Sequence, residues 1–221
     1  MTKMLIAPME GHEFQFTRNW FHDRNRSSFR DYILPFWVEK PCIYLEIGVF
    51  EGMSLVWTLQ HVLTHPESRA IGIDPWLMTV KFSEEDMEKT KSRAFHNLSP
   101  WMIPTTSVRG GHMKCRLIRG NSAEVLRKMR RRRWGFEGIQ KNSVDLCMID
   151  GNHNELGVLD DARVSFDLLK VGGWMCFDDV ENDKRKFEHV RQGLHMFLQE
   201  ENRVKLLWKD RHMEAYEKVE E

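Results

Sequence analysis

The 221-residue chain has no apolar run that approaches the ~20 residues of a membrane-spanning helix, and its N-terminal stretch MTKMLIAPMEGHEF has no apolar segment of signal-peptide length. It also has no net charge, because 33 Lys and Arg residues balance 33 Asp and Glu residues. No overall field therefore favours nucleic acid or an anionic membrane as the partner. These absences predict a soluble, cytoplasmic protein without a membrane partner.

Cysteine is scarce and widely spaced. The four cysteines are Cys42, Cys115, Cys147 and Cys176, and no two of them form a Cys-x-x-Cys pair. This spacing indicates neither a zinc knuckle nor a disulfide framework. Each cysteine falls in a short apolar run, so we expect small core residues in a reducing compartment.

The stretch YLEIGVFEG, residues 44–52, lacks the fingerprints of two common glycine-rich loops. A P-loop needs four residues between its glycines, whereas three separate Gly48 from Gly52, and position 50 of a dinucleotide fingerprint would be Gly rather than Phe50. Glu46 and Glu51 would also repel a phosphate. The loop therefore predicts a ligand that carries a positive group.

Short apolar segments alternate with segments of helical periodicity along the chain. The predicted strands are 42–47, 69–74, 114–118, 144–150 and 174–178. A helical stripe that includes Leu159 and Phe166 is expected to stop at Val-Gly-Gly, residues 171–173. Two further strands within 203–210 and 212–219 predict a terminal hairpin. The fold class is therefore α/β, with a Rossmann-like, doubly wound sheet of about seven strands that is mostly parallel and ends in an antiparallel hairpin.

The length favours one main domain. We expect an N-terminal helical cap over residues 1–40 and a main α/β domain over 41–221, with a lid-like insertion at 78–113. A helix within that insertion is predicted to begin at Ser83. The cap is expected to cover either the site entrance or the dimer face of a homo-oligomer.

Polar residues follow the predicted strands where an open parallel sheet binds ligands. Asp74 ends the second strand, about 20 to 25 residues past the glycine loop, where an acid can accept hydrogen bonds from both hydroxyls of a ribose. The alternative is an acid that starts a turn before Pro75. Asn121 and Ser122 follow the third strand and either cap the next helix or contact an adenine.

Three further acids, Asp150, Asp178 and Asp179, follow the fourth and fifth strands. Carboxylates so close together repel one another unless a cation lies between them. Oxygen ligands favour Mg²⁺, Ca²⁺ or Mn²⁺ over zinc. The alternative is that Asp178 and Asp179 cap the following helix.

Five segments resemble, in order, the motifs of class I S-adenosylmethionine-dependent methyltransferases. They are YLEIGVFEG, IGIDPW, IRGNSAEVL, MIDGNHNELGVLDDA and LLKVGGWMCFDDV. The chain is most similar to the branch of macrocin-type, Mg²⁺-dependent sugar O-methyltransferases and cephalosporin-hydroxylase-like proteins. The resemblance covers residues 41–180 and implies methylation of a hydroxyl of a small molecule or a sugar.

The resemblance also implies a set of site residues. The expected contacts to S-adenosylmethionine are Glu46, Gly48, Phe50, Glu51 and Gly52 near its methionine end, Asp74 at the ribose, and Asn121 and Ser122 near the adenine. Asp150 and His153 are expected to contact the cofactor as well. The expected Mg²⁺ ligands are Asp150, Asp178 and Asp179. The ion would hold two substrate oxygens and lower the pKa of the reacting hydroxyl.

One position departs from that branch. Characterised sugar methyltransferases have a second Asp, the proposed base, where this chain has Asn152, which cannot accept a proton. His153 is the next residue and could be the base, acting with Asp150 as the catalytic pair. Alternatively, His153 donates a hydrogen bond to the cofactor or the backbone.

A basic run lies at 127–133. It favours a solvated helix end, and contact with RNA is the alternative. Two other functions therefore stay open, an RNA-directed methyltransferase and a non-catalytic cofactor-binding module of the same fold.

Overall fold

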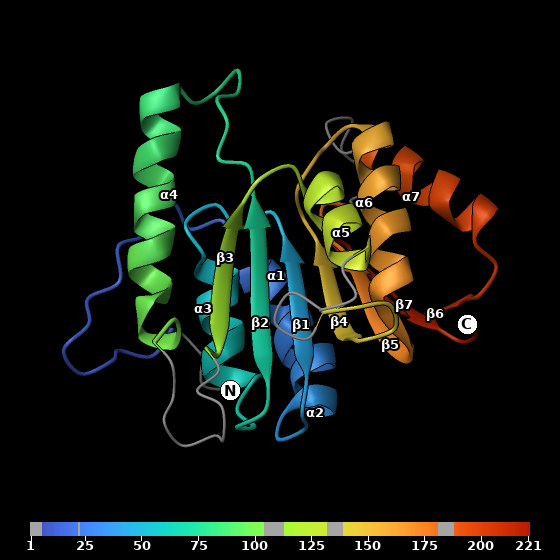
Figure 1. Cartoon of the computed structure of the whole chain (residues 1–221), viewed down its shortest axis with the longest axis horizontal. Coiled ribbons are helices and arrows are strands. Elements are labelled where there is room, and N and C mark those ends of the chain that lie inside the picture. The colour runs from blue at the N-terminus through green and yellow to red at the C-terminus, as the bar shows by residue number, and fades with distance from the viewer. Residues whose placement is uncertain (1–5, 22, 104–112, 132–138, 181–187) are drawn as a thin grey trace. The chain divides into compact units, whose positions relative to one another are not determined.

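The computed structural model describes residues 6–21, 23–103, 113–131, 139–180 and 188–221 (Figure 1). The helices are α1 (Asp23–Ser28), the π-helix η1 (Phe29–Ile33), α2 (Leu34–Trp37), α3 (Met53–His61), α4 (Glu84–Leu98), the 3₁₀ helix η2 (Ser99–Trp101), α5 (Ser122–Arg131), α6 (Glu155–Leu168) and α7 (Glu188–Glu200). The strands are β1 (Ile43–Ile47), β2 (Arg69–Asp74), β3 (Cys115–Arg119), β4 (Val144–Ile149), β5 (Leu169–Phe177), β6 (Val204–Lys209) and β7 (Glu214–Lys218).

The strands form one seven-stranded sheet in the order β3-β2-β1-β4-β5-β7-β6. The pairs β2–β3, β1–β4 and β4–β5 are parallel, whereas β7 runs antiparallel to both β5 and β6. The predicted fold class, including the terminal antiparallel hairpin, is confirmed. Among the described residues, no helix is both long enough and apolar enough to cross a bilayer.

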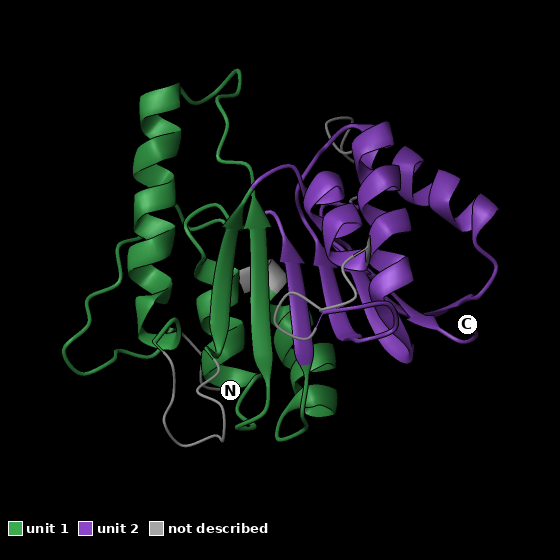
Figure 2. Cartoon of the chain, in the orientation of Figure 1, with its two compact units in different colours: residues 1–42, 49–119 green, residues 43–48, 120–221 purple. Residues whose placement is uncertain are grey.

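The chain divides into two compact units (Figure 2). Unit 1 comprises residues 1–42 and 49–119, and unit 2 comprises residues 43–48 and 120–221. The predicted division at residue 40 differs from these boundaries, and as a statement about domains it stays a prediction.

In unit 2, strands β1 and β4 to β7 carry helices α5, α6 and α7 (Figure 2). Helix α6 contacts the strands β4 and β5 and the helices α5 and α7. Its residues Val158, Ala162, Phe166 and Leu168 are buried, as the predicted helical stripe requires. This packing holds the carboxyl ends of β1, β4 and β5 in place.

In unit 1, β2 and β3 are accompanied by α3, α4 and the N-terminal segment. The predicted start of α4 is confirmed, because Ser83 and Asp86 form a reciprocal capping box. In the N-terminal segment, the rings of Phe21 and Phe29 contact the buried Trp57 of α3. The expected N-terminal helices are therefore present and pack on α3. Of the predicted lid-like insertion at 78–113, residues 104–112 lie outside the described residues, and its role as a lid stays a prediction.

The expected helix stop at 171–173 is wrong. Helix α6 already ends at Leu168, and β5 runs from Leu169 through both glycines. The pairing of β4 with β5 shifts register between Val144 and Leu146, and Gly172 has a φ of +81°. A glycine at positive φ allows a bulge within a strand, so these glycines bend β5 rather than end a helix.

All four cysteines are free and buried, as expected of small core residues.

Candidate active site

The predicted site residues are distributed over both units, and each group is described within its own unit. Unit 2 holds Glu46, Gly48, Asn121, Ser122, Asp150, His153, Asp178 and Asp179. Unit 1 holds Phe50, Glu51, Gly52 and Asp74.

The turn after β1 lies against the end of β4, where the order of the strands reverses. Gly48 has a φ of +89°, and a Cβ atom at this position would lie 1.9 Å from the carbonyl oxygen of Asp150. The N–H of Asp150 donates to the carbonyl of Ile47 at 2.9 Å. Only glycine allows so close an approach, and open α/β sheets bind ligands at this kind of reversal.

Glu46 is a buried acid on β1. Its side chain is 1% exposed, and one of its oxygens accepts a hydrogen bond of 2.7 Å from the hydroxyl of Tyr44. Burial and the nearby Glu46 carboxylate raise the pKa of Tyr44, which keeps that hydroxyl protonated as a donor. The contact of Glu46 with the methionine end of the cofactor stays a prediction.

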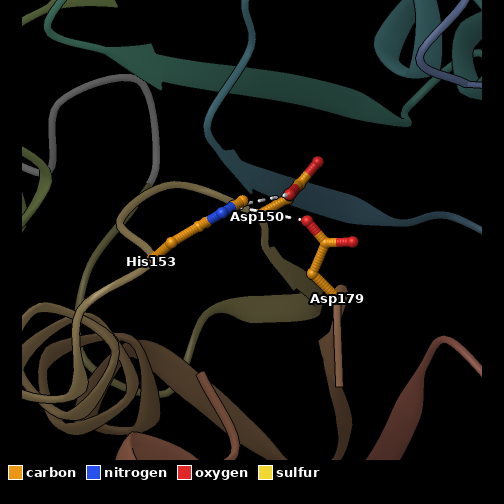
Figure 3. A group of neighbouring side chains, drawn as sticks. All are labelled: Asp150, His153 and Asp179. Atoms are coloured by element: carbon orange, nitrogen blue, oxygen red, sulfur yellow. Dashed lines mark ion pairs between the residues drawn. The ribbon is translucent and has the colours of Figure 1, made fainter. Parts of the chain in front are cut away.

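Asp150, His153 and Asp179 bring three potential ligand atoms within 4.8 Å of one another (Figure 3). His153 Nε2 lies 3.9 Å from Asp150 Oδ1 and 3.5 Å from Asp179 Oδ2. The side chains are 48% exposed at His153, 40% at Asp150 and 27% at Asp179. Asp179 also has a φ of +57°, and such strained non-glycine residues concentrate at functional sites. The expected association of Asp150 with Asp179 is thus present, with the histidine as its third member.

Asp178 has a different environment. Its side chain is 7% exposed, and its Oδ1 accepts the backbone N–H of Asp179 at 2.8 Å. Burial, together with the negative charges of Asp150 and Asp179, raises the pKa of Asp178 well above its usual value. Asp178 is not among the three residues whose ligand atoms converge. Its role as a metal ligand stays a prediction.

Asn152 is turned toward the start of α6. Its Oδ1 accepts the backbone N–H of Asn154 at 3.1 Å, and Asn154 itself caps α6 by accepting the N–H of Gly157. A Cβ atom on Gly157 would lie 2.4 Å from the Asn152 side chain. The residue that stands where relatives carry their proposed base therefore supports the N-terminus of a helix here.

The start of α5 confirms the capping alternative for Asn121. Its Oδ1 accepts the N–H of Glu124 at 3.1 Å, in the manner of an N-cap. The hydroxyl of Ser122 donates to Oδ1 of Asp161 on α6. Burial raises the pKa of Asp161 to about 6. A contact of either residue with adenine stays a prediction.

In unit 1, Asp74 fixes the backbone of the glycine loop. Its Oδ2 accepts the N–H groups of Val49 and Phe50, each at 2.9 Å, and its Oδ1 accepts the N–H of Trp76 at 2.7 Å. Asp74 is 8% exposed. The acid at the end of β2 therefore both starts a turn, as the alternative held, and shapes the loop.

An aromatic group surrounds Phe50, and the pattern of the sequence alone did not identify it. The Phe50 ring stacks on Trp20 with centroids 4.1 Å apart and lies 5.7 Å from Phe82, while the indole N–H of Trp76 donates to the Phe50 carbonyl. Phe50 has a φ of +53°, and Trp20 is 51% exposed. The sequence gives little sign of this group, because the partners of Trp20, Phe50 and Phe82, lie at least 30 residues from it along the chain.

Glu51 is an anchor within unit 1. It is 2% exposed, accepts hydrogen bonds from the N–H and hydroxyl of Thr17, and pairs with Arg93 at 3.2 Å. Gly52 is the N-cap residue of α3 and has a φ of +80°, and a Cβ atom there would lie 2.9 Å from the Leu98 side chain. Both residues stabilise the loop, and their contact with the cofactor stays a prediction.

Two arginines of the basic run pair with acids of α6. Arg127 contacts Asp160 at 3.1 Å, and Arg130 pairs with Asp167. These pairs favour the interpretation as an ordinary helix end; Arg132 and Arg133 lie outside the described residues.

Comparison with known proteins identifies the family. The profile of a methyltransferase domain matches residues 45–180, which is more than half of the chain. The chain therefore belongs to this methyltransferase-domain family, and the predicted resemblance to S-adenosylmethionine-dependent methyltransferases is confirmed. The uncharacterized protein R132 of Acanthamoeba polyphaga mimivirus is 27% identical over 139 residues, 63% of this chain and 52% of that protein. The chain thus spans about half the length of this curated relative.

Three solved structures share the fold. A proposed O-methyltransferase from Klebsiella pneumoniae has a TM-score of 0.61 at 14% identity and covers 90% of this chain and 82% of its own. MycE of the mycinamycin biosynthetic pathway, in complex with Mg, S-adenosylhomocysteine and mycinamycin VI, has a TM-score of 0.53 at 21% identity. The match covers 93% of this chain and 51% of MycE. CalS11, a TDP-rhamnose 3′-O-methyltransferase of calicheamicin biosynthesis, has a TM-score of 0.51 at 15% identity. The match covers 86% of this chain and 76% of CalS11.

Proposed function

We propose that the protein transfers the methyl group of S-adenosylmethionine to a hydroxyl oxygen of a small molecule, with a sugar as the preferred class of acceptor and a divalent metal ion as a second cofactor. The observation that carries this proposal is the convergence of Asp150, His153 and Asp179 at the carboxyl ends of β4 and β5, next to the glycine turn after β1. This is the place where open α/β sheets bind ligands.

The residues fit the chemistry of S-adenosylmethionine. Gly48 leaves space for backbone to approach a ligand, and the buried Glu46 carboxylate suits the ammonium group of the methionine end. Asp74 suits the ribose, because it ends β2, where an acid can accept hydrogen bonds from ribose hydroxyls. Asn121 and Ser122 would lie near the adenine, and Phe50 would add an apolar contact.

The donor set also fits a divalent ion. Asp150 and Asp179 provide carboxylate oxygens on neighbouring strand ends, which are the ligands that such an ion prefers. When bound, such an ion supplies Lewis-acid chemistry that lowers the pKa of a hydroxyl ligand and orients it. The residues around the ion would hold the acceptor hydroxyl in line with the methyl group and exclude other orientations.

Two residues are candidates for accepting the proton of the hydroxyl. His153 and Asp150 lie on one loop, and both side chains are exposed enough to reach a bound acceptor. Imidazole and carboxylate groups are both common general bases.

A sugar is the preferred acceptor because of two neighbours in fold. CalS11 is described as acting on TDP-rhamnose, and MycE was crystallised with the macrolide mycinamycin VI together with Mg.

The test is transfer of a radioactive methyl group from S-adenosylmethionine to a panel of sugars and nucleotide sugars, with and without EDTA. We expect incorporation that EDTA abolishes and that is lost in Asp179→Ala. The matched control is Asp160→Ala, which removes a surface acid of α6 that is 46% exposed. If the cofactor binds but no hydroxyl compound is methylated, the non-catalytic alternative replaces this proposal.

A further inference from the structure

The candidate metal group contains a nitrogen donor, which the predicted all-carboxylate site did not. His153 Nε2 lies closer to Asp179 Oδ2, at 3.5 Å, than to Asp150 Oδ1, at 3.9 Å, so the imidazole faces both carboxylates (Figure 3). Asp178, the predicted third ligand, does not belong to the converging set. The donor set is therefore one imidazole nitrogen with two carboxylate oxygens.

These separations suit a shared ion. With metal–ligand bonds of about 2.1 Å, two donors on adjacent corners of an octahedron are about 3.0 Å apart, and two on opposite corners are about 4.2 Å apart. The separations of 3.5 and 3.9 Å lie between these two values rather than at either, and all three atoms lie within 4.8 Å of one another. Binding of one ion by all three donors therefore requires an adjustment of the side chains, none of which is buried.

The electrostatic setting favours a cation at this place. Oxygens of two carboxylates, Asp150 and Asp179, lie within 4.8 Å of each other and of the imidazole nitrogen of His153. The imidazole itself carries a positive charge only when it is protonated, and a neutral imidazole is a metal ligand. A divalent ion would therefore relieve the repulsion among the acids.

We infer that His153 is a metal ligand and that this site takes a first-row transition ion such as Mn²⁺ in preference to Mg²⁺. Mg²⁺ prefers oxygen ligands in an octahedral arrangement and keeps several waters, whereas imidazole nitrogen binds transition ions well. This inference rests on the proposed function only in assuming that the site holds a metal. A His153 that binds the ion through Nε2 is not the base.

The test measures metal binding without cofactor or acceptor. The protein is freed of metal with a chelator, and the dissociation constants for Mn²⁺ and Mg²⁺ are measured by calorimetry for the wild type, His153→Ala and His189→Ala. His189 is the matched control, because it lies in the same unit on α7, is 59% exposed and pairs with Glu155. We expect the wild type and His189→Ala to bind Mn²⁺ at least about tenfold more tightly than Mg²⁺, and His153→Ala to lose most of that preference.

A spectroscopic measurement makes the test independent of whether the variant folds well. Pulsed electron paramagnetic resonance of the Mn²⁺-loaded wild type should show coupling to a histidine nitrogen, which changes on ¹⁵N-histidine labelling. Absence of that coupling would overturn the inference, as would a Mn²⁺ preference in His153→Ala equal to that of the wild type. Full methyl transfer with Mg²⁺ in His153→Ala, where only oxygen ligands remain, would overturn the inference while leaving the proposed function standing. Failure to bind S-adenosylmethionine counts only against the proposed function.

Discussion

Replacement of Gly48 by alanine tests how closely the turn after β1 must approach β4. The added Cβ atom would lie 1.9 Å from the carbonyl oxygen of Asp150 and 2.8 Å from Cα of Gly151, and both of these are backbone atoms that cannot rotate away. The φ of +89° adds a second penalty, because a left-handed conformation costs an L-residue about 1–2 kcal/mol. Relief of the overlap requires movement of the end of β4, and overpacking of this kind costs about 1–3 kcal/mol. Together we expect a loss of about 2–5 kcal/mol in the free energy of unfolding.

Gly172→Ala is the matched control for this prediction. Gly172 has a similar φ of +81°, but no atom lies within 4 Å of the position of its Cβ, so only the conformational cost of about 1–2 kcal/mol applies. Urea denaturation of both variants gives the two free energies. The Gly48 variant should lose clearly more stability and should also bind S-adenosylhomocysteine more weakly, because Asp150 is displaced. Equal losses in the two variants would refute the close approach.

Three further predictions concern stability and partners. Burial raises the pKa of Asp161 from 3.8 to about 6, so the folded state binds more protons than the unfolded state between these values, and the free energy of unfolding should fall by up to about 3 kcal/mol as the pH rises through that range. Asp161→Asn should flatten this dependence in urea titrations at pH 4, 5.5 and 7, and a slope like that of the wild type would contradict the assignment. Glu51→Ala leaves Arg93 and the Thr17 donors without this acceptor, so urea denaturation should show that the free energy of unfolding falls by about 2–4 kcal/mol. A fall of less than about 1 kcal/mol would mean that the anchor is weak. Replacement of Arg127 and Arg130 by serine should lower the free energy of unfolding by about 1 kcal/mol or less and leave the retention of RNA on filters unchanged. Salt-sensitive RNA binding that disappears in this variant would support the RNA-directed alternative.

Much of the fold follows from short-range patterns in the sequence. Strands buried on both faces are continuous apolar runs, and the predicted strand at 69–74 has the bounds that the structure gives to β2. The capping box at Ser83 marked the start of α4 in the same local way. The pattern failed at 171–173, because glycines that stop a helix and glycines that bend a strand have the same sequence signature.

The candidate site was predictable where it depends on topology. Parallel strands place their carboxyl ends at one edge, so acids that follow β4 and β5 were expected to meet, and Asp150 and Asp179 do. The roles of individual side chains were less accessible. The partners of Glu51 at Thr17 and Arg93 lie 34 and 42 residues away, and no local periodicity encodes such contacts. Likewise, only the three-dimensional arrangement turns Asn152 toward α6 and His153 toward the two acids.

Calorimetric titration of the purified protein with S-adenosylhomocysteine and S-adenosylmethionine tests the central claim most directly. The account predicts saturable binding of one cofactor molecule per chain, with the affinity strongly reduced in the Gly48→Ala variant and retained in the Gly172→Ala control. Absence of binding of both compounds to a protein that circular dichroism shows to be folded would contradict it.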